Sequence, residues 1–149
     1  MVCGLGRLYD ILDLYYNTII LKEVTLMTIT TFDPLIVSAH AADAIKVFEV
    51  LGFEQTHAPV TTTETGDVST VRMKDANGFH VDVAQVDAFE HDMTMIRMNV
   101  DDFEEAYKIL KDHGFTNTRG DDTLDAKSSK EATMVSPSGF RIALVKHIK

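Results

Sequence analysis

The 149-residue chain has one cysteine, Cys3, and no tryptophan. A single cysteine excludes an internal disulfide and a cluster of thiolate metal ligands, and it suits a reducing compartment. No apolar run approaches the roughly 20 residues that a bilayer span requires, and the N-terminus lacks an apolar segment followed by a small-residue cleavage site. We therefore expect a cytoplasmic protein with no membrane partner.

Positive charge is scarce as well. Lys and Arg total 14 against 23 Asp and Glu, which gives a formal net charge of -9. A chain of this charge repels a phosphate backbone, so we expect no nucleic-acid partner. The sequence also lacks a glycine-rich phosphate loop and a serine or cysteine in a recognisable nucleophile setting. Its apolar content of 45% is enough for one core, and its length favours one globular domain.

Residues 1–26 differ in character from the rest of the chain and have no counterpart in the repeat described below. The codons of Lys22–Val24 can form a bacterial ribosome-binding sequence shortly before the codon of Met27. We therefore expect 1–26 to be a non-native, upstream-translated extension, and 27–149 to be a single domain. The alternative is a genuine amphipathic helix over 8–21, where apolar residues recur at helical spacing.

From Met27 onward the chain contains two copies of one unit. The segment AIKVFEVLGFEQT, which begins at Ala44, matches AYKILKDHGFTNT, which begins at Ala106, at an offset of 62. The segment MKDANGFHVDV, from Met73, matches MVSPSGFRIAL, from Met134, at an offset of 61. Because the order is kept and the offset barely changes, we predict a tandem repeat.

The two repeats span about 30–88 and 92–148, and each is predicted to fold as β-α-β-β-β. FDPLIVSA and MTMIRMNV have the alternation of strands. A helix follows each, with an apolar stripe for burial against a sheet. The stripes consist of Ala41, Ala44, Ile45 and Phe48 in the first repeat, and of Phe103, Ala106, Tyr107 and Leu110 in the second.

Short polar residues mark where these elements begin and end. Asp102 with Glu105 is typical of a capping box at a helix start, and Gly52 and Gly114 are placed to end the two helices. Asn77-Gly78 and Ser138-Gly139 suit the turns that join the last two strands of each unit. The polar segment 119–130 lacks alternation and is predicted to be a loop.

Together these elements predict an α+β fold in which two tandem βαβββ units form an eight-stranded curved mixed sheet around a shared cavity. The helices are expected on the outer face of this sheet. Side chains alternate along a strand, so one face of each strand is assigned to the cavity. The inner face is predicted to carry Asp33, Leu35, Val37, His80, Asp82, Ala84, Met95, Arg97, Asn99, Arg141, Ala143 and Val145.

These motifs resemble the vicinal oxygen chelate superfamily, which includes glyoxalase I, bleomycin-resistance proteins and extradiol dioxygenases. VFEVLGFE resembles the family's Phe-Tyr-x-x-Leu-Gly-Phe, and SPSGFRIAL resembles its Asp-Pro-x-Gly-x-x-Ile-Glu. VDDFEEAYKILKDHGF is also similar to the family, and the resemblance covers residues 30–148. It implies the fold just described and a homodimer, but the fold hosts many functions.

The metalloenzymes of this family hold a divalent ion with four side chains, from the first and last strand of each unit. By the resemblance, these positions are Asp33, Asp82, Met95 and Ala143. A methyl group cannot coordinate a metal, and a thioether suits soft ions only. We therefore expect no divalent metal and no other cofactor. Two alternatives remain: a displaced metal site that uses Asp82 with His80 and His57, or a solvated Asp82 that bonds His80 or pairs with Arg97 or Arg141.

The sequence thus predicts a glyoxalase-like or bleomycin-resistance-like protein that binds a small polar molecule in the cavity, with no catalytic residue identified. The predicted ligand-binding residues are Asp33, His80, Asp82, Met95, Arg97, Asn99 and Arg141. One alternative is a metal-dependent lyase, isomerase or dioxygenase with a rearranged site. The other is a non-catalytic association module whose cavity is filled by side chains.

Overall fold

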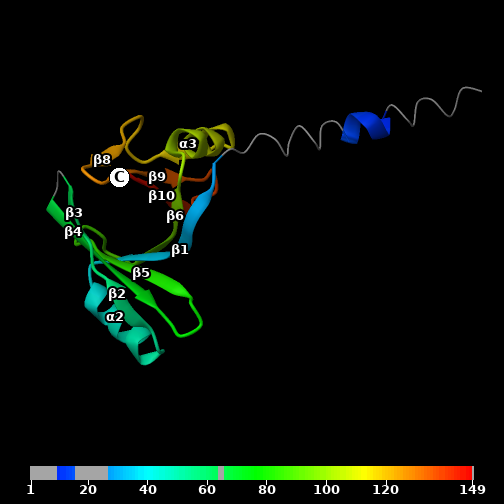
Figure 1. Ribbon diagram of the computed structural model, residues 1–149. Helices are drawn as coiled ribbons and strands as arrows, with labels where there is room; N and C mark the ends of the chain where they lie inside the picture. Colours follow the sequence, from blue (N-terminus) through cyan, green and yellow to red (C-terminus); the bar gives the residue numbers. More distant parts are fainter. Residues whose placement is uncertain (1–9, 16–26, 64–65, 149) are drawn as a thin grey trace, which may run out of the picture.

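The computed structural model describes residues 10–15, 27–63 and 66–148 (Figure 1). The first repeat contains β1 (Ile29–Ser38), α2 (Ala41–Val50), β2 (Glu54–His57), β3 (Val60–Thr63), β4 (Gly66–Lys74) and β5 (His80–Gln85). The second contains β6 (Met93–Val100), α3 (Phe103–Asp112), β7 (Thr116–Asn117), β8 (Leu124–Ala126), β9 (Ser129–Val135) and β10 (Arg141–His147).

Residues 10–15 form a short helical segment with exposed side chains. The remainder of the alternative helix over 8–21 lies outside the described residues, and the expectation that 1–26 is an extension stays a prediction. Within the described ranges, no helix combines the length and apolar character that crossing a bilayer requires.

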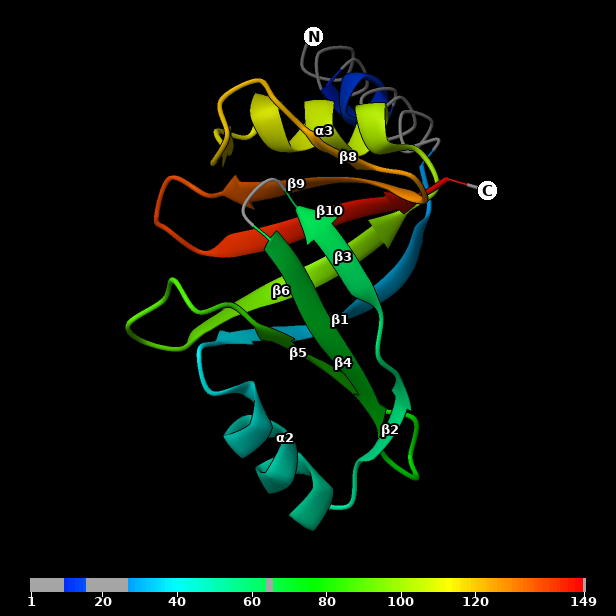
Figure 2. The same cartoon turned by 90° about the vertical axis from the view of Figure 1, so that its left-hand side faces the viewer.

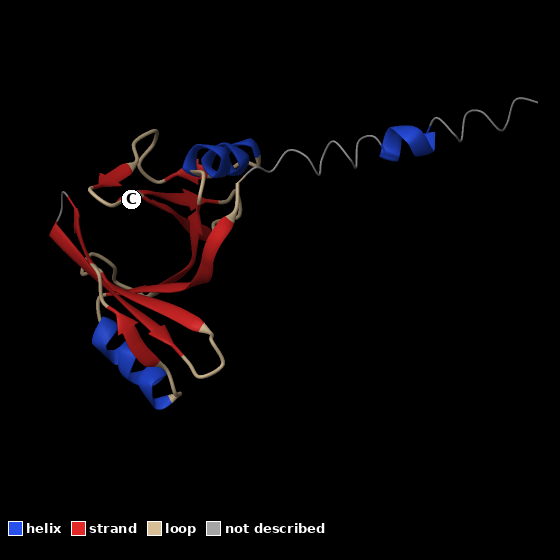
Figure 3. Ribbon diagram, viewed as in Figure 1, coloured by secondary structure: helices blue, strands red, loops and turns tan. Residues whose placement is uncertain are grey.

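The strands form one mixed sheet, in the order β2-β4-β5-β1-β6-β10-β9-β7, with β3 paired to β4 and β8 paired to β9. At its centre β1 and β6 run antiparallel, and each is flanked by a parallel strand of its own repeat, β5 or β10. The sheet curves strongly (Figure 1), and β3 and β8, near its opposite ends, come into contact. In the view of Figure 2, β3 and β4 cross in front of β10 and β6. Both helices lie outside this curve (Figure 3). The predicted fold class is confirmed.

The sheet has ten described strands, where the sequence predicted eight, because the second strand of each repeat is divided in two. In the first repeat the division falls at Ala58-Pro59, and proline has no backbone N–H to give to a sheet. In the second repeat a turn separates β7 from β8. The prediction of a loop over 119–130 is therefore wrong in part, since β8 forms a hairpin with β9 at the sheet edge.

The helices begin and end as their sequence predicts. Asp102 caps α3, and its Oδ1 accepts a hydrogen bond of 3.1 Å from the backbone N–H of Glu105. Gly52 and Gly114 follow the helices with φ of +99° and +87°, a region that favours glycine. The apolar stripe of α3 then packs on the outer face of β6, β9 and β10. This core is composed of Met98, Val100, Phe103, Ala106, Ala132, Met134, Ile142 and Leu144.

The second face of the same strands is turned away from the helices, as strand alternation requires. Met134 and Leu144 are fully buried under α3, whereas Ala143 and Val145, next to Leu144, line the inside of the curve. The helices thus fix which side chains are available on the inner face. That face is where a functional site can form.

Candidate functional site

A cavity of about 690 Å³ lies inside the curved sheet, and both repeats line it. A buried apolar cluster forms part of the wall, with Leu35, Val37, Val68, Ala84, Val86 and Met95. Polar residues come from both repeats: His57, Thr61, Thr63 and Thr70 from the first, and Thr118, Ser128, Ser129, Glu131, Thr133 and His147 from the second. Because the wall offers both kinds of surface, the cavity suits a molecule with an apolar part and a polar part.

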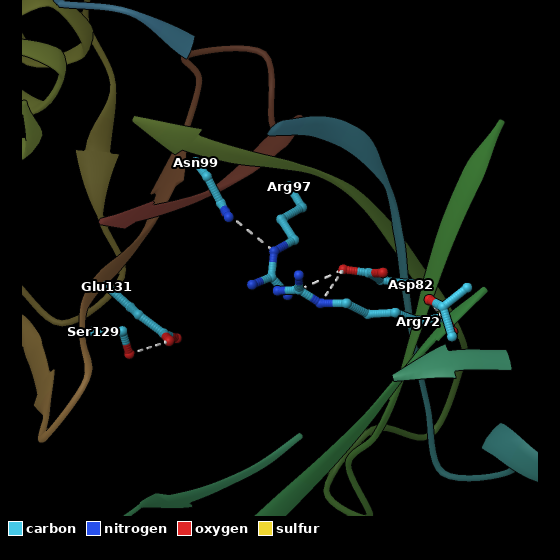
Figure 4. A network of polar contacts seen from close by, with 7 residues as sticks. Arg72, Asp82, Arg97, Asn99, Ser129 and Glu131 are labelled. Atoms are coloured by element: carbon cyan, nitrogen blue, oxygen red, sulfur yellow. Dashed lines mark hydrogen bonds and ion pairs between the residues drawn. The ribbon is translucent and has the colours of Figure 1, made fainter. Parts of the chain in front are cut away.

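Three arginines lie on the cavity wall: Arg72 from β4, Arg97 from β6 and Arg141 from β10. The guanidinium of Arg97 donates from Nη1 to Oδ2 of Asp82 at 3.0 Å and from Nε to Oδ1 of Asn99 at 3.2 Å (Figure 4). Asp82 is only 1% exposed, so this is a buried ion pair. Asn99 is buried as well, and its amide oxygen fixes the orientation of the guanidinium.

Arg72 approaches the same carboxylate from the neighbouring strand (Figure 4). Its Nε lies 3.8 Å from Oδ2 of Asp82, which is within ion-pair range but too long for a hydrogen bond. This Nε is buried and has no hydrogen-bond partner. Sequence reasoning missed Arg72, although the β4–β5 hairpin places it directly opposite Asp82. Counting outward from the Asn77-Gly78 turn could have found it.

The structure brings together most of the predicted ligand-binding residues, though in different settings. Met95, Arg97 and Arg141 line the cavity, whereas Asp82 and Asn99 are buried behind Arg97.

The other two predicted residues lie apart from the main cavity. Asp33 is 7% exposed and borders an adjoining, smaller hollow with Met95 and Arg141. His80 is exposed at the first residue of β5 and borders a separate hollow with Phe53 and Phe79.

Asp33 is a second buried carboxylate beside this ion pair. Its Oδ1 is buried without a hydrogen-bond partner. Burial and the negative charge of Asp82 raise the pKa of Asp33, against opposing effects of Arg97, Arg72 and His80. Burial and the neighbouring Arg72 lower the pKa of Arg97, against opposing effects of Asp82, Asp33 and Glu131. The site therefore holds its charges in a poorly hydrated setting.

The raised pKa of Asp33 predicts a pH-dependent stability. A carboxyl group whose pKa in the folded state lies above its usual value of 3.8 holds its proton more tightly when the protein is folded. Its contribution to stability is therefore complete below pH 3.8 and is lost as the pH rises through the pKa of the folded state. Asp33→Asn should therefore raise the free energy of unfolding by about 1 kcal/mol at pH 7.5, the scale of one desolvated polar group, and by less at pH 4.5. Urea unfolding at both pH values measures this difference.

The exposed Asp67, on β4, provides a control: Asp67→Asn should change little at either pH. A loss of stability in Asp33→Asn at pH 7.5 would contradict the prediction, because it would mean that ionised Asp33 stabilises the fold through the nearby arginines.

The residues present do not fit the divalent metal of the metalloenzymes that the sequence motifs resemble. Two of the four corresponding positions are Met95 and Ala143, which offer a thioether and a methyl group. A third, Asp82, is already bonded to a guanidinium, whose charge would repel a divalent ion. Within the described residues, no group of three or more His, Cys, Asp or Glu side chains is placed to hold a metal.

No family model and no curated protein matches the chain. Solved structures do resemble it, at low identity. A methylmalonyl-CoA epimerase has a TM-score of 0.57 and 19% identity over 78% of this chain and 94% of its own. The methylmalonyl-CoA epimerase from Streptomyces coelicolor has a TM-score of 0.58 and 15% identity over 82% and 100%.

A third similar structure is a glyoxalase/bleomycin resistance protein/dioxygenase superfamily member from Vibrio splendidus 12B01, with a TM-score of 0.52. It shares 16% identity over 81% of this chain and 100% of its own. At such identities the likeness concerns the fold and not the activity. Together with the paired βαβββ units and the cavity between them, these neighbours show that the chain has the vicinal oxygen chelate fold.

Proposed function

We propose that the chain binds a small polar organic molecule in the cavity between its repeats, without a divalent metal. The observation that carries this proposal is the polar inner face itself: a cavity of about 690 Å³ with three arginines and a glutamate on its wall. Its volume falls within the range of about 300–1,000 Å³ that is typical of small-molecule sites.

The pairing of Arg97 with Asp82 supports the metal-free part of the proposal. In a site that holds a divalent ion, carboxylates face the metal, which supplies the positive charge. Here the guanidinium of Arg97 supplies that charge to Asp82 at 3.0 Å. The polar groups on the wall are then available to orient a ligand by hydrogen bonds, as in a binding protein.

A bulky side chain in the cavity should abolish binding. Thr61, on β3, lines the cavity, whereas the next residue, Thr62, is exposed on the other side of the strand. We expect Thr61→Trp to remove the rise in melting temperature that bound metabolites cause, and Thr62→Trp to keep it. The measurement is a thermal-shift screen of the full chain against a metabolite library, in which a true ligand raises the melting temperature with the logarithm of its concentration.

Two outcomes would overturn the proposal. If no compound in the library stabilises the protein, the cavity is not a ligand site, and the alternative of an association module is favoured. If stabilising compounds act equally on Thr61→Trp and Thr62→Trp, they bind elsewhere.

A further inference from the structure

We infer that the ligand is an organic carboxylate, with one negative charge next to an apolar body. This inference rests on the proposed function, since it names the class of molecule that the same cavity holds. It is argued from three observations: the ion pairs of the arginines, their unused donors, and the apolar cluster on the wall.

The arginines of the cavity differ in their ion pairs, although the whole chain has a net charge of -9. Three guanidinium groups, those of Arg72, Arg97 and Arg141, face the cavity. Asp82 pairs with Arg97 at 3.0 Å and lies 3.8 Å from Arg72, whereas no described carboxylate lies within ion-pair distance of Arg141. A single carboxylate of the ligand would give Arg141 its partner. A phosphate ester, with close to two charges, would bring a second negative charge near Asp33, Asp82 and Glu131.

Donors on two of the arginines have no acceptor within the protein. In the described part of the chain, Arg72 makes no hydrogen bond through its side chain; its Nε is buried, and the exposed quarter of the side chain lies on the cavity wall. Among the described residues, Arg141 makes neither a hydrogen bond nor an ion pair through its side chain, and it is half-buried. A guanidinium that is partly removed from water without an acceptor is poorly compensated, so a ligand oxygen that reaches the terminal NH₂ groups of these arginines gains affinity. Arginine pairs with carboxylates through two parallel hydrogen bonds.

The rest of the wall indicates what the carboxylate is attached to. Val37, Ala84 and Met95 form a buried apolar cluster, which Val68 and Phe89 extend along the cavity. An ion without an apolar part would leave this surface in contact with water. A carboxylate carried on a ring or an alkyl chain would cover it, and each buried methylene would add about 0.8 kcal/mol to binding.

Matched probes test this inference. The full chain is titrated in a calorimeter with octanoate, 3-phenylpropanoate and 4-phenylbutanoate, with the primary amide of each, and with 2-phenylethyl phosphate. We expect at least one acid to bind about tenfold or more tightly than its amide, because hydrogen bonds to charged groups are worth about 1.5–3 kcal/mol. The phosphate ester should bind more weakly than the acid with the same ring.

Variants assign the effect to the two arginines. Arg141→Gln and Arg72→Gln should each weaken the acid about tenfold while leaving the amide unchanged, and Arg141→Lys should recover part of the loss. Lys111→Gln, on the exposed side of α3, removes one positive charge away from the cavity and serves as the control. It should leave the binding of the acid unchanged. The melting temperature of each variant, measured alongside, confirms that the variant is folded.

Several results would overturn the inference. Equal binding of acid and amide would show that charge is not recognised, and tighter binding of the phosphate ester would show that the carboxylate assignment is wrong. Unchanged acid binding in both glutamine variants would place the acid elsewhere. Library hits that are all neutral would sink the inference but leave the proposed function standing, whereas the absence of any ligand would sink both.

Discussion

Asp82→Ala should lower the free energy of unfolding by about 3–5 kcal/mol, the largest effect that we expect from a single substitution in this site. The carboxylate of Asp82 is 1% exposed and accepts a hydrogen bond from Arg97, with Arg72 3.8 Å away. Its removal leaves two guanidinium groups close together without their counterion, in a setting where burial already lowers the pKa of Arg97. Urea unfolding of the full chain at pH 7.5 measures the loss.

Asp67→Ala provides the matched control, because Asp67 is an exposed carboxylate on a strand of the same sheet. It should change the free energy of unfolding by less than about 0.5 kcal/mol. A loss below about 1 kcal/mol in Asp82→Ala would mean that water replaces the carboxylate, and that the buried ion pair is not a structural element of the fold.

The second large effect is expected when both partners of the pair are changed. Asp82→Leu alone should cost about 3–5 kcal/mol, and Arg97→Met alone somewhat less, because Arg72 remains near Asp82. The double variant should cost clearly less than the sum of the two, since neither Asp82 nor Arg97 is then left buried without the other. Unfolding of the four proteins forms a double-mutant cycle whose coupling energy measures the interaction.

Strictly additive losses would contradict this expectation, because they would show that Asp82 and Arg97 do not interact. The cycle also separates stability from binding. If the double variant regains stability and still binds ligands, then the pair is structural and Arg72 and Arg141 hold the ligand. Binding lost in a stable double variant would place Arg97 in direct contact with the ligand.

The sequence predicted the fold well because the signals for strands, helices and turns lie within short segments and occur in both repeats. Strand alternation, helix stripes and turn glycines recur at a nearly constant offset, so each repeat supports the interpretation of the other. The strand MTMIRMNV is found at Met93–Val100 as predicted, and Met95 faces the cavity while Met98 lies in the core. Periodicity assigns a face to each residue without any knowledge of its neighbours.

The contents of the site were harder to predict because they depend on pairing between strands. Alternation along the strand placed His80 on the same face as Asp82, and His80 was therefore predicted to reach the cavity. Alternation does not show where the strand begins, and β5 begins at His80, which borders a separate hollow. Asp82 was expected as a solvated carboxylate that bonds His80 or pairs with Arg97 or Arg141. Arg97 is its partner, but the expectation of a solvated group is wrong, because Asp82 is 1% exposed. Arg72 required the register of the β4–β5 hairpin, which alternation within one strand does not supply.

The most direct test of the proposed function is one calorimetric titration carried out twice. The acid that binds tightest in the panel is titrated into the full chain as purified and again after exhaustive treatment with a chelator, with elemental analysis of both samples. We expect the same dissociation constant in both titrations and far less than one equivalent of Zn, Ni, Fe or Mn in either sample. Binding that disappears with the chelator and returns when one equivalent of metal is added would contradict the proposal.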